Sequence, residues 1–288
     1  MRARYTYLVS VAVLLTIAHV AAQPDVSSDL RTVVEAKLNV RPGGLASRCP
    51  IYEDWVAARV FVEYGAEFLA EKPAVIPSKC IVESDAELAA VWQFMNSRTA
   101  KIGTVPVTLQ EPALSALLEA RADATKRGIG ITPRGGSIAS TRSYANTVDL
   151  WKSRFEPALN YWVRQGRIKL ADAAAARKLS IRKQVEAVLN WEQNGIYFSK
   201  DLSKSILYSV AIPGASQHNF MLALDIEQYG NPTVRQILAD HGWFQTVKSD
   251  LPHFTYLGLK EADLPKSGLK PVIISGQKFW VPNVNDQR

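Results

Sequence analysis

The sequence predicts a mixed fold in which helices are interspersed with short strands. Its 288 residues are 47% hydrophobic and 21% charged, a globular composition that can bury a core in one large domain or two small ones. Apolar residues recur at helical spacing in several segments, and short β-rich runs lie between them. Helices are expected over 52–69, 85–95, 111–127, within 146–194 and over 231–242, and strand-like runs over 104–109, 129–132, 205–211, 222–226, 272–274 and 279–281.

Residues with strong capping preferences mark the ends of these helices. Ser84 is expected to cap the helix that follows it, with Glu87 completing a capping box. Asn231 is the expected N-cap of the helix over 231–242. His241 falls in the last turn of that helix, where a cation interacts favourably with the helix dipole. We therefore interpret His241 as structural.

The first residues resemble a secretory signal. Arg2 and Arg4 supply a positive start, residues 8–20 are apolar, and small residues precede an expected cleavage before Gln23. Removing residues 1–22 takes away two arginines and no acid, so the formal net charge falls from +7 to +5. We expect an exported protein, periplasmic or secreted and soluble after cleavage, with an uncleaved anchor as the alternative.

The remaining positive charge suits an anionic polymer such as cell wall, or a membrane surface. A solvated surface without a specific partner is the alternative. Nucleic-acid binding is not expected, because the sequence has no stripe of alternating basic and aromatic residues.

The two cysteines are Cys49 and Cys80. An even number in an exported chain favours a disulfide, which would stabilise the fold by about 3–4 kcal/mol in the chain-entropy model. Free thiols or zinc ligands are the alternatives, but neither cysteine has a CxxC partner. This part of the chain is interpreted as a disulfide-stapled N-terminal lobe.

Residue types that bind metals gather near the C-terminal third of the chain. His218 and Asp225 lie in the stretch 216–225, and Asp250 and His253 follow a short distance later. The whole sequence has four histidines, and one of them lies in the predicted signal. A catalytic zinc site uses three His or carboxylate ligands and an open position, which His218, Asp225 and His253 can supply.

The spacing of these residues requires a turn. Positions seven apart on a regular strand point to opposite faces, so His218 and Asp225 could not share a metal there. A turn over 219–221 followed by a strand over 222–226 solves this. Pro252 disfavours a helix at Leu251 and places Asp250 in a loop before a strand at His253. From there Asp250 can exchange protons with bound water without coordinating the metal.

The pattern Ser-x-His-x(6)-Asp, followed by acid-x-x-His, resembles the zinc D-Ala-D-Ala peptidases, the VanY-like carboxypeptidases with the Hedgehog/DD-peptidase fold. Ala223 lies where the family pattern has alanine, and Pro213-Gly214 precedes it as in the family. Arg142-Ser143-Tyr144 resembles the family's arginine motif. The resemblance covers roughly residues 104–258.

The resemblance implies an α+β fold, in which helices pack against a small antiparallel sheet that carries a zinc site. It also implies roles for individual residues: His218, Asp225 and His253 as zinc ligands, Asp250 as general base, Arg142 as oxyanion stabiliser, and Ser216 and Tyr256 as substrate contacts. An arginine aimed at a developing oxyanion typically contributes a few kcal/mol.

The sequence departs from the family pattern in three places. Met221 replaces a glycine, and Asp250 replaces the glutamate usual in D,D-carboxypeptidases. Aspartate there is familiar from L-alanyl-D-glutamate endopeptidases. The third departure is a long helical insertion. The expected division is a signal (1–22), an N-terminal lobe (23–103), a peptidase domain (104–260) with an insertion near 146–204, and an extension (261–288).

Taken together, these features predict an exported zinc metallopeptidase that hydrolyses peptidoglycan stem peptides, with D-alanyl-D-alanine carboxypeptidase as the first interpretation. An L-alanyl-D-glutamate or cross-link endopeptidase is the alternative within enzymes. A cell-wall-binding protein without catalytic activity is the alternative from another class.

Overall fold

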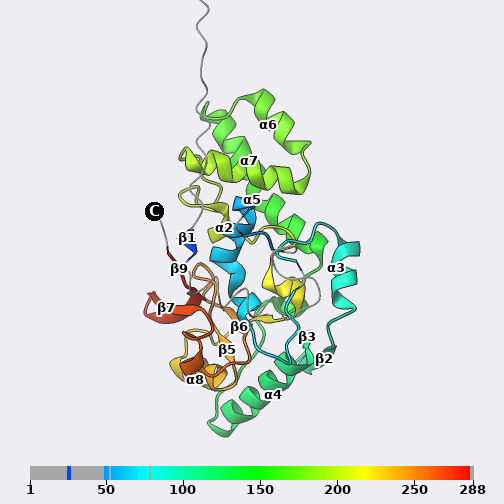
Figure 1. Ribbon diagram of the computed structural model, residues 1–288, viewed down its shortest axis with the longest axis vertical. Helices are drawn as coiled ribbons and strands as arrows, with labels where there is room; N and C mark the ends of the chain where they lie inside the picture. The colour runs from blue at the N-terminus through cyan, green and yellow to red at the C-terminus, as the bar shows by residue number, and fades with distance from the viewer. Residues whose placement is uncertain (1–24, 27–48, 52, 78, 286–288) are drawn as a thin grey trace, which may run out of the picture.

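The computed structural model describes residues 25–26, 49–51, 53–77 and 79–285 (Figure 1). Within them, helices and small antiparallel sheets form an α+β fold, which confirms the predicted class. The predicted signal and most of the predicted N-terminal lobe up to residue 48 lie outside the described residues. The helices are α2 (Trp55–Tyr64), α3 (Asp85–Trp92), α4 (Glu111–Lys126), α5 (Tyr144–Arg164), α6 (Leu170–Arg177), α7 (Ile181–Gln193) and α8 (Pro232–Asp240).

A three-stranded antiparallel sheet lies at the centre of the fold. Its order is β4 (Ala223–Asp225), β6 (His253–Tyr256) and β5 (Trp243–Phe244). Short two-stranded pairs surround it. They are β2 (Ser97–Ile102) with β3 (Val105–Gln110), β7 (Leu269–Ile274) with β8 (Gln277–Pro282), and β1 (Asp25–Val26) with β9 (Val284–Asn285).

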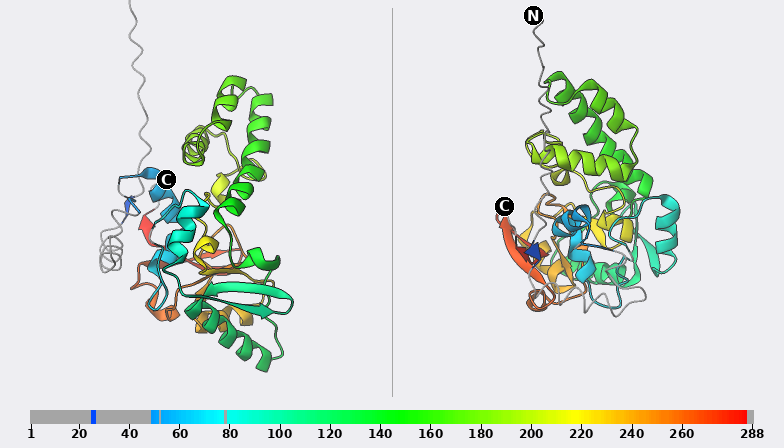
Figure 2. Two further views of the ribbon diagram at one scale, coloured as in Figure 1. Left: turned by 90° about the vertical axis from the view of Figure 1, so that its right-hand side faces the viewer. Right: turned by 45° about the horizontal axis from the view of Figure 1, so that its top comes forward.

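Helices α5, α6 and α7 form a projecting unit, which we call the helical arm (Figures 1 and 2). It corresponds to the predicted helical region after residue 146. Trp151 and Phe155 of α5 stack in series with Phe198 and Trp191, with ring centroids 5.7–6.5 Å apart. These stacked rings form the core of the arm.

Helix α2 lies between the arm and the rest of the molecule. Val56, Val60 and Tyr64 pack in the hydrophobic cluster of the arm. Phe61 belongs instead to the cluster that contains the central sheet. Asp54 caps α2 by accepting hydrogen bonds from its first turn, and it also pairs with Arg182 of α7 at 2.5 Å. One helix thus anchors both parts.

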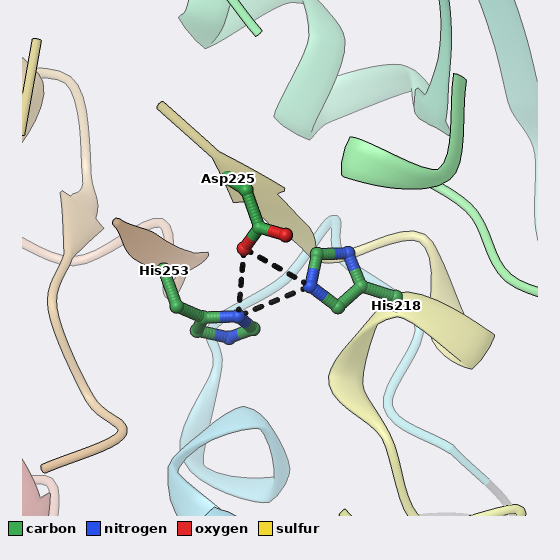
Figure 3. Close-up of side chains that lie close together, drawn as sticks. All are labelled: His218, Asp225 and His253. Carbon is green, nitrogen blue, oxygen red and sulfur yellow. Dashed lines mark hydrogen bonds and ion pairs between the residues drawn. The ribbon is translucent and has the colours of Figure 1, made fainter. Parts of the chain in front are cut away.

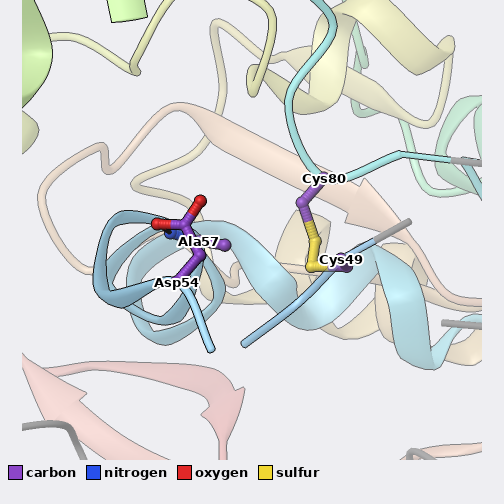
Figure 4. Close-up of a disulfide and its surroundings, with 4 residues drawn as sticks. All are labelled: Cys49, Asp54, Ala57 and Cys80. Atoms are coloured by element: carbon purple, nitrogen blue, oxygen red, sulfur yellow. Dashed lines mark hydrogen bonds between the residues drawn. A yellow bond between two sulfur atoms is a disulfide. The ribbon is translucent and has the colours of Figure 1, made fainter. Parts of the chain in front are cut away.

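The predicted disulfide is present. Cys49 and Cys80 are bonded, with their Cα atoms 4.9 Å apart, close to the start of α2 (Figure 4). Both cysteines are buried in the same cluster as the central sheet. Among the described residues, no helix is both long and apolar enough to cross a membrane.

Two predicted strands are wrong. Residues 205–211 contain the 3-10 helix η3 (Ile206–Tyr208), because the buried Glu192 carboxylate accepts the Ile206 N–H at 2.6 Å and Ser205 caps the turn. Residues 129–132 form no strand either, since Thr132 N–H bonds to the Gln228 side chain instead of a sheet neighbour.

Strand β2 is the longest of the strands that the sequence pattern did not predict, the others being β1, β5 and β9. Strand β2 is polar and mostly exposed, so it lacks the apolar alternation that identifies strands. It forms through a tight turn at Gly103, whose φ of +62° suits glycine, and through pairing with β3.

Candidate metal centre

The segment 217–225 adopts the predicted turn and strand. Residues Gln217–Phe220 form the 3-10 helix η4, and Met221 ends it in the left-handed conformation at φ +57°. Strand β4 then begins at Ala223. Because Met221 reverses the chain, His218 is directed back toward Asp225. A left-handed backbone explains why glycine suits this position in the resembling family.

Strand pairing brings the third side chain to the same place. In the antiparallel register of β4 and β6, Asp225 lies directly opposite His253. Leu222, Leu224 and Ile226 are buried in the core beneath the sheet, at the two-residue period of a strand.

Three side-chain atoms converge at this point (Figure 3). His218 Nε2 lies 3.1 Å from His253 Nδ1, and these nitrogens lie 3.3 Å and 3.4 Å from Asp225 Oδ1. Both histidines are buried. The three residues form a group whose ligand atoms could hold one metal ion.

Hydrogen bonds on the far side of each ring define its tautomer. His218 Nδ1 lies 3.3 Å from the Ser140 carbonyl, which can only accept. His253 Nε2 lies 2.7 Å from Gln217 Oε1. Both outer nitrogens therefore carry the proton, so the two inner nitrogens present lone pairs to each other.

The orientation of Gln217 is itself determined by its surroundings. Its Nε2 donates to the Tyr64 carbonyl at 2.7 Å, so Oε1 must face the other way. Thr255 Oγ1 donates to the same oxygen at 2.5 Å. Gln217 thus fixes the ring orientation of His253 through a hydrogen bond. Metal-binding histidines in other proteins are commonly oriented in this way, by a partner on the ring nitrogen that faces away from the metal.

Arg142 holds the carboxylate of the group. Its Nη2 donates to Asp225 Oδ2 at 2.7 Å, and its Nε donates to the Ile138 carbonyl. The other carboxylate oxygen, Oδ1, is buried without a hydrogen-bond partner among the described residues. The sequence predicted Arg142 near the site, but this contact with Asp225 was not foreseen.

The electrostatics agree with a neutral His218 and an ionised Asp225 carboxylate. Burial lowers the pKa of His218 to about 4, against the opposing effect of Asp225. Burial alone would raise the pKa of Asp225, but the adjacent His218 and His253 hold it well below its usual range. Two lone pairs and a carboxylate oxygen would repel one another without a cation, so these residues fit a bound metal ion.

A pocket of 280 Å³ opens beside the two histidines. Asp250 and Ser216 line it, as does Arg142. Asp250 is not part of the metal-binding group, in agreement with the predicted loop position. Burial raises the pKa of the Asp250 carboxyl. The structure therefore gathers three of the four predicted non-metal site residues around the pocket.

Tyr256 is the predicted site residue that the structure does not bring to the pocket. It lies three positions after His253 in β6, so it faces the opposite side of the strand. Its ring packs against Trp243 at 5.5 Å. His241, interpreted above as structural, does not line the pocket, and its Nε2 lies 2.9 Å from Asp123 on α4.

Sequence reasoning missed the residues that support the ligands. Gln217 was visible between the motif residues Ser216 and His218, but its partner Tyr64 lies 153 positions away. Ser140 acts through its main-chain carbonyl, which no side-chain pattern reveals.

Searches of protein-family models and of curated proteins found no match. A search of solved structures found a likeness to the LdcB LD-carboxypeptidase, whose structure is described as revealing the molecular basis of peptidoglycan recognition. The TM-score is 0.31 and the sequence identity 17%, over 55% of this chain and 64% of that one. The chain thus matches less than two thirds of that structure.

Proposed function

We propose that this protein is an exported zinc metallopeptidase that hydrolyses peptidoglycan stem peptides, acting as a D-alanyl-D-alanine carboxypeptidase. The observation that carries the proposal is the convergence of His218 Nε2, His253 Nδ1 and the buried Asp225 Oδ1 beside a pocket. The substrate class rests on the motif resemblance of these same residues.

The spacing of the three atoms supports zinc. Ligands about 2.1 Å from a tetrahedral zinc ion lie about 3.4 Å from one another. The observed separations are 3.1, 3.3 and 3.4 Å. Two imidazoles and one carboxylate are also a ligand set that zinc accepts in catalytic sites.

A bound zinc ion supplies Lewis-acid activation of water and of the scissile carbonyl. Asp250 lines the pocket next to the histidines and takes the proton from the attacking water, then delivers it to the leaving amine. Its raised pKa brings that exchange nearer to neutral pH. Ser216 faces the same pocket as a substrate contact.

Arg142 has two roles in this proposal. Its pairing with Asp225 Oδ2 orients Oδ1 toward the metal. Its guanidinium also lines the pocket, where it stabilises negative charge on the carbonyl oxygen during attack.

Export and the division of the chain belong to the proposal as well. The Cys49–Cys80 disulfide suits an oxidising compartment outside the cytoplasm. Residues 1–22 are proposed as the signal, 23–103 as the N-terminal lobe, 104–260 as the peptidase domain and 261–288 as an extension.

An endopeptidase is the second candidate. The aspartate at position 250 favours it through the motif resemblance. A larger pocket, lined by Lys200 and Lys204, also shares Tyr208 and Ser249 with the pocket at the metal centre. A substrate that continues on both sides of the cut bond could occupy the two together.

Digestion of purified muropeptides tests the proposal. We expect the zinc-loaded protein to release a single terminal D-alanine, and a chelator to abolish the release. Asp250→Asn should lower kcat by about 10²- to 10⁴-fold with zinc retained, because it removes the proton acceptor. Asp172→Asn, on the exposed surface of α6, is the matched control.

Mass analysis separates the candidates. Products cut inside the stem peptide would show that the protein is an endopeptidase and not a carboxypeptidase. A protein that binds muropeptides equally well with Asp250→Asn and never cleaves them would be a wall-binding protein. A chain that retains no zinc would overturn the metallopeptidase altogether.

A further inference from the structure

The helical arm contributes an arginine to the pocket at the metal centre. Arg154 of α5 lines this pocket together with His218, His253 and Asp250. Thr147 and Leu150 of the same helix complete that wall. The motif resemblance assigns no role to Arg154, which lies in the insertion.

The two arginines of the pocket differ in their partners. Arg142 is paired with the Asp225 carboxylate at 2.7 Å. Arg154 donates from Nη1 to its neighbour, to Ser153 Oγ at 3.0 Å and to the Ser153 carbonyl at 3.4 Å. Its Nε is buried and has no hydrogen-bond partner in the described part of the chain.

A buried guanidinium donor without an acceptor is costly, because the group gives up hydration and gains nothing in return. Such groups in proteins are normally satisfied by a carboxylate, by water or by a ligand. The planar guanidinium matches a carboxylate, with which it can form two parallel hydrogen bonds. The Arg154 guanidinium lines the pocket and has no carboxylate partner among the described residues, so it fits an anionic, planar group of the ligand.

We propose that Arg154 binds the free C-terminal carboxylate of the peptide substrate. This inference rests on the proposed function, because it places that carboxylate in the pocket beside the metal centre. The helical insertion then has a defined role, since α5 recognises the end of the peptide while the central sheet holds the metal. Recognition of a free carboxylate also selects removal of a terminal residue over a cut within the stem.

Binding measurements on the full-length, zinc-loaded chain test this proposal. The probes are diacetyl-L-lysyl-D-alanyl-D-alanine and the same tripeptide with a C-terminal amide. Asp250→Asn serves as the background, so that turnover does not disturb titration calorimetry. We expect the acid to bind more tightly than the amide, and Arg154→Ala to weaken binding of the acid by about 10- to 100-fold while leaving the amide unchanged.

Two further variants control for structure. Arg154→Lys keeps the charge but loses the paired hydrogen bonds, so it should recover part of the preference for the acid. Arg164→Ala removes an exposed arginine from the last turn of the same helix and should change neither titration. Circular dichroism verifies that each variant is folded.

The possible results separate this inference from the proposed function. Equal binding of acid and amide by the parent chain, or an unchanged preference in folded Arg154→Ala, overturns the role of Arg154. Failure of the wild-type protein to hydrolyse the acid tripeptide instead contradicts the carboxypeptidase, and the two titrations still report on Arg154.

Discussion

The metal centre and the helical arm place side chains at one pocket by different means. At the metal centre, backbone register decides the geometry: Asp225 and His253 are opposite each other in paired strands. In the arm, side-chain packing decides it, through the stacked rings around Phe155. If the two proposals hold, metal binding and substrate recognition are carried by separable parts, which are joined through α2.

The largest effects are expected when one buried aromatic side chain is truncated in each of these two parts. Phe155→Ala in the arm and Phe254→Ala in β6 should each lower the free energy of unfolding by about 3–5 kcal/mol, because both rings are fully buried. Only Phe254→Ala should also weaken zinc binding, since Phe254 adjoins His253. Chemical denaturation and competition with a chromogenic chelator measure the two quantities. Equal losses of zinc affinity would show that the parts are not separable.

A smaller effect is expected from the support of the metal centre. Gln217→Ala removes the acceptor of the His253 Nε2 proton and should lower zinc affinity by about 10- to 100-fold. Gln217→Glu keeps an acceptor and should recover most of the affinity. Chelator competition measures both, with the exposed Gln236→Ala on α8 as control. If the Ala and Glu variants lose the same affinity, the role of Gln217 is packing alone.

Buried carboxyls also differ between the two regions. Burial raises the pKa of Glu67, next to the central core, well above its ordinary value. Burial raises the pKa of Glu192 in the arm too, but hydrogen bonds from Ser205, Ile206 and Phe198 oppose the shift. Glu67 has no such partner for Oε2 among the described residues.

These shifts predict how stability depends on pH. The folded protein keeps a proton on Glu67 that the unfolded chain releases above its ordinary pKa, so the contribution of Glu67 to stability is highest below that pKa and falls as pH rises toward the folded-state pKa. The slope approaches about 1.4 kcal/mol per pH unit. Glu67→Gln should remove this slope, and Glu192→Gln should change the slope less. Urea unfolding between about pH 4 and 8 measures how the free energy of unfolding depends on pH. Identical slopes in wild type and Glu67→Gln would contradict the prediction.

The smallest effect concerns the turn that directs His218. Met221 is buried and left-handed, so both Met221→Ala and Met221→Gly lose its packing. The glycine variant should be more stable than the alanine variant by about 1 kcal/mol, because alanine is strained at positive φ. Thermal unfolding compares them. An alanine variant as stable as the glycine variant would mean that the turn relaxes.

Several features of this protein could be predicted from its sequence because they depend on neighbouring residues. Ser84 accepts the Glu87 N–H and Asn231 accepts the Thr233 N–H, each at the start of its helix. The need for a turn after His218 followed from the two-residue period of a strand alone. The Cys49–Cys80 bond was predictable because the chain has only one pair of cysteines.

Only the tertiary structure determined the features that depend on contacts between residues far apart in the sequence. Residues 205–211 have the composition of a strand, but a buried carboxylate 14 positions before Ile206 takes its N–H and a 3-10 turn forms. Arg142 pairs with Asp225 across 83 positions, and Gln217 is oriented by a carbonyl of α2. Local pattern selects the types of residue at the metal centre. Packing selects their partners, because a hydrogen bond depends on distance in space and direction rather than on separation in the chain.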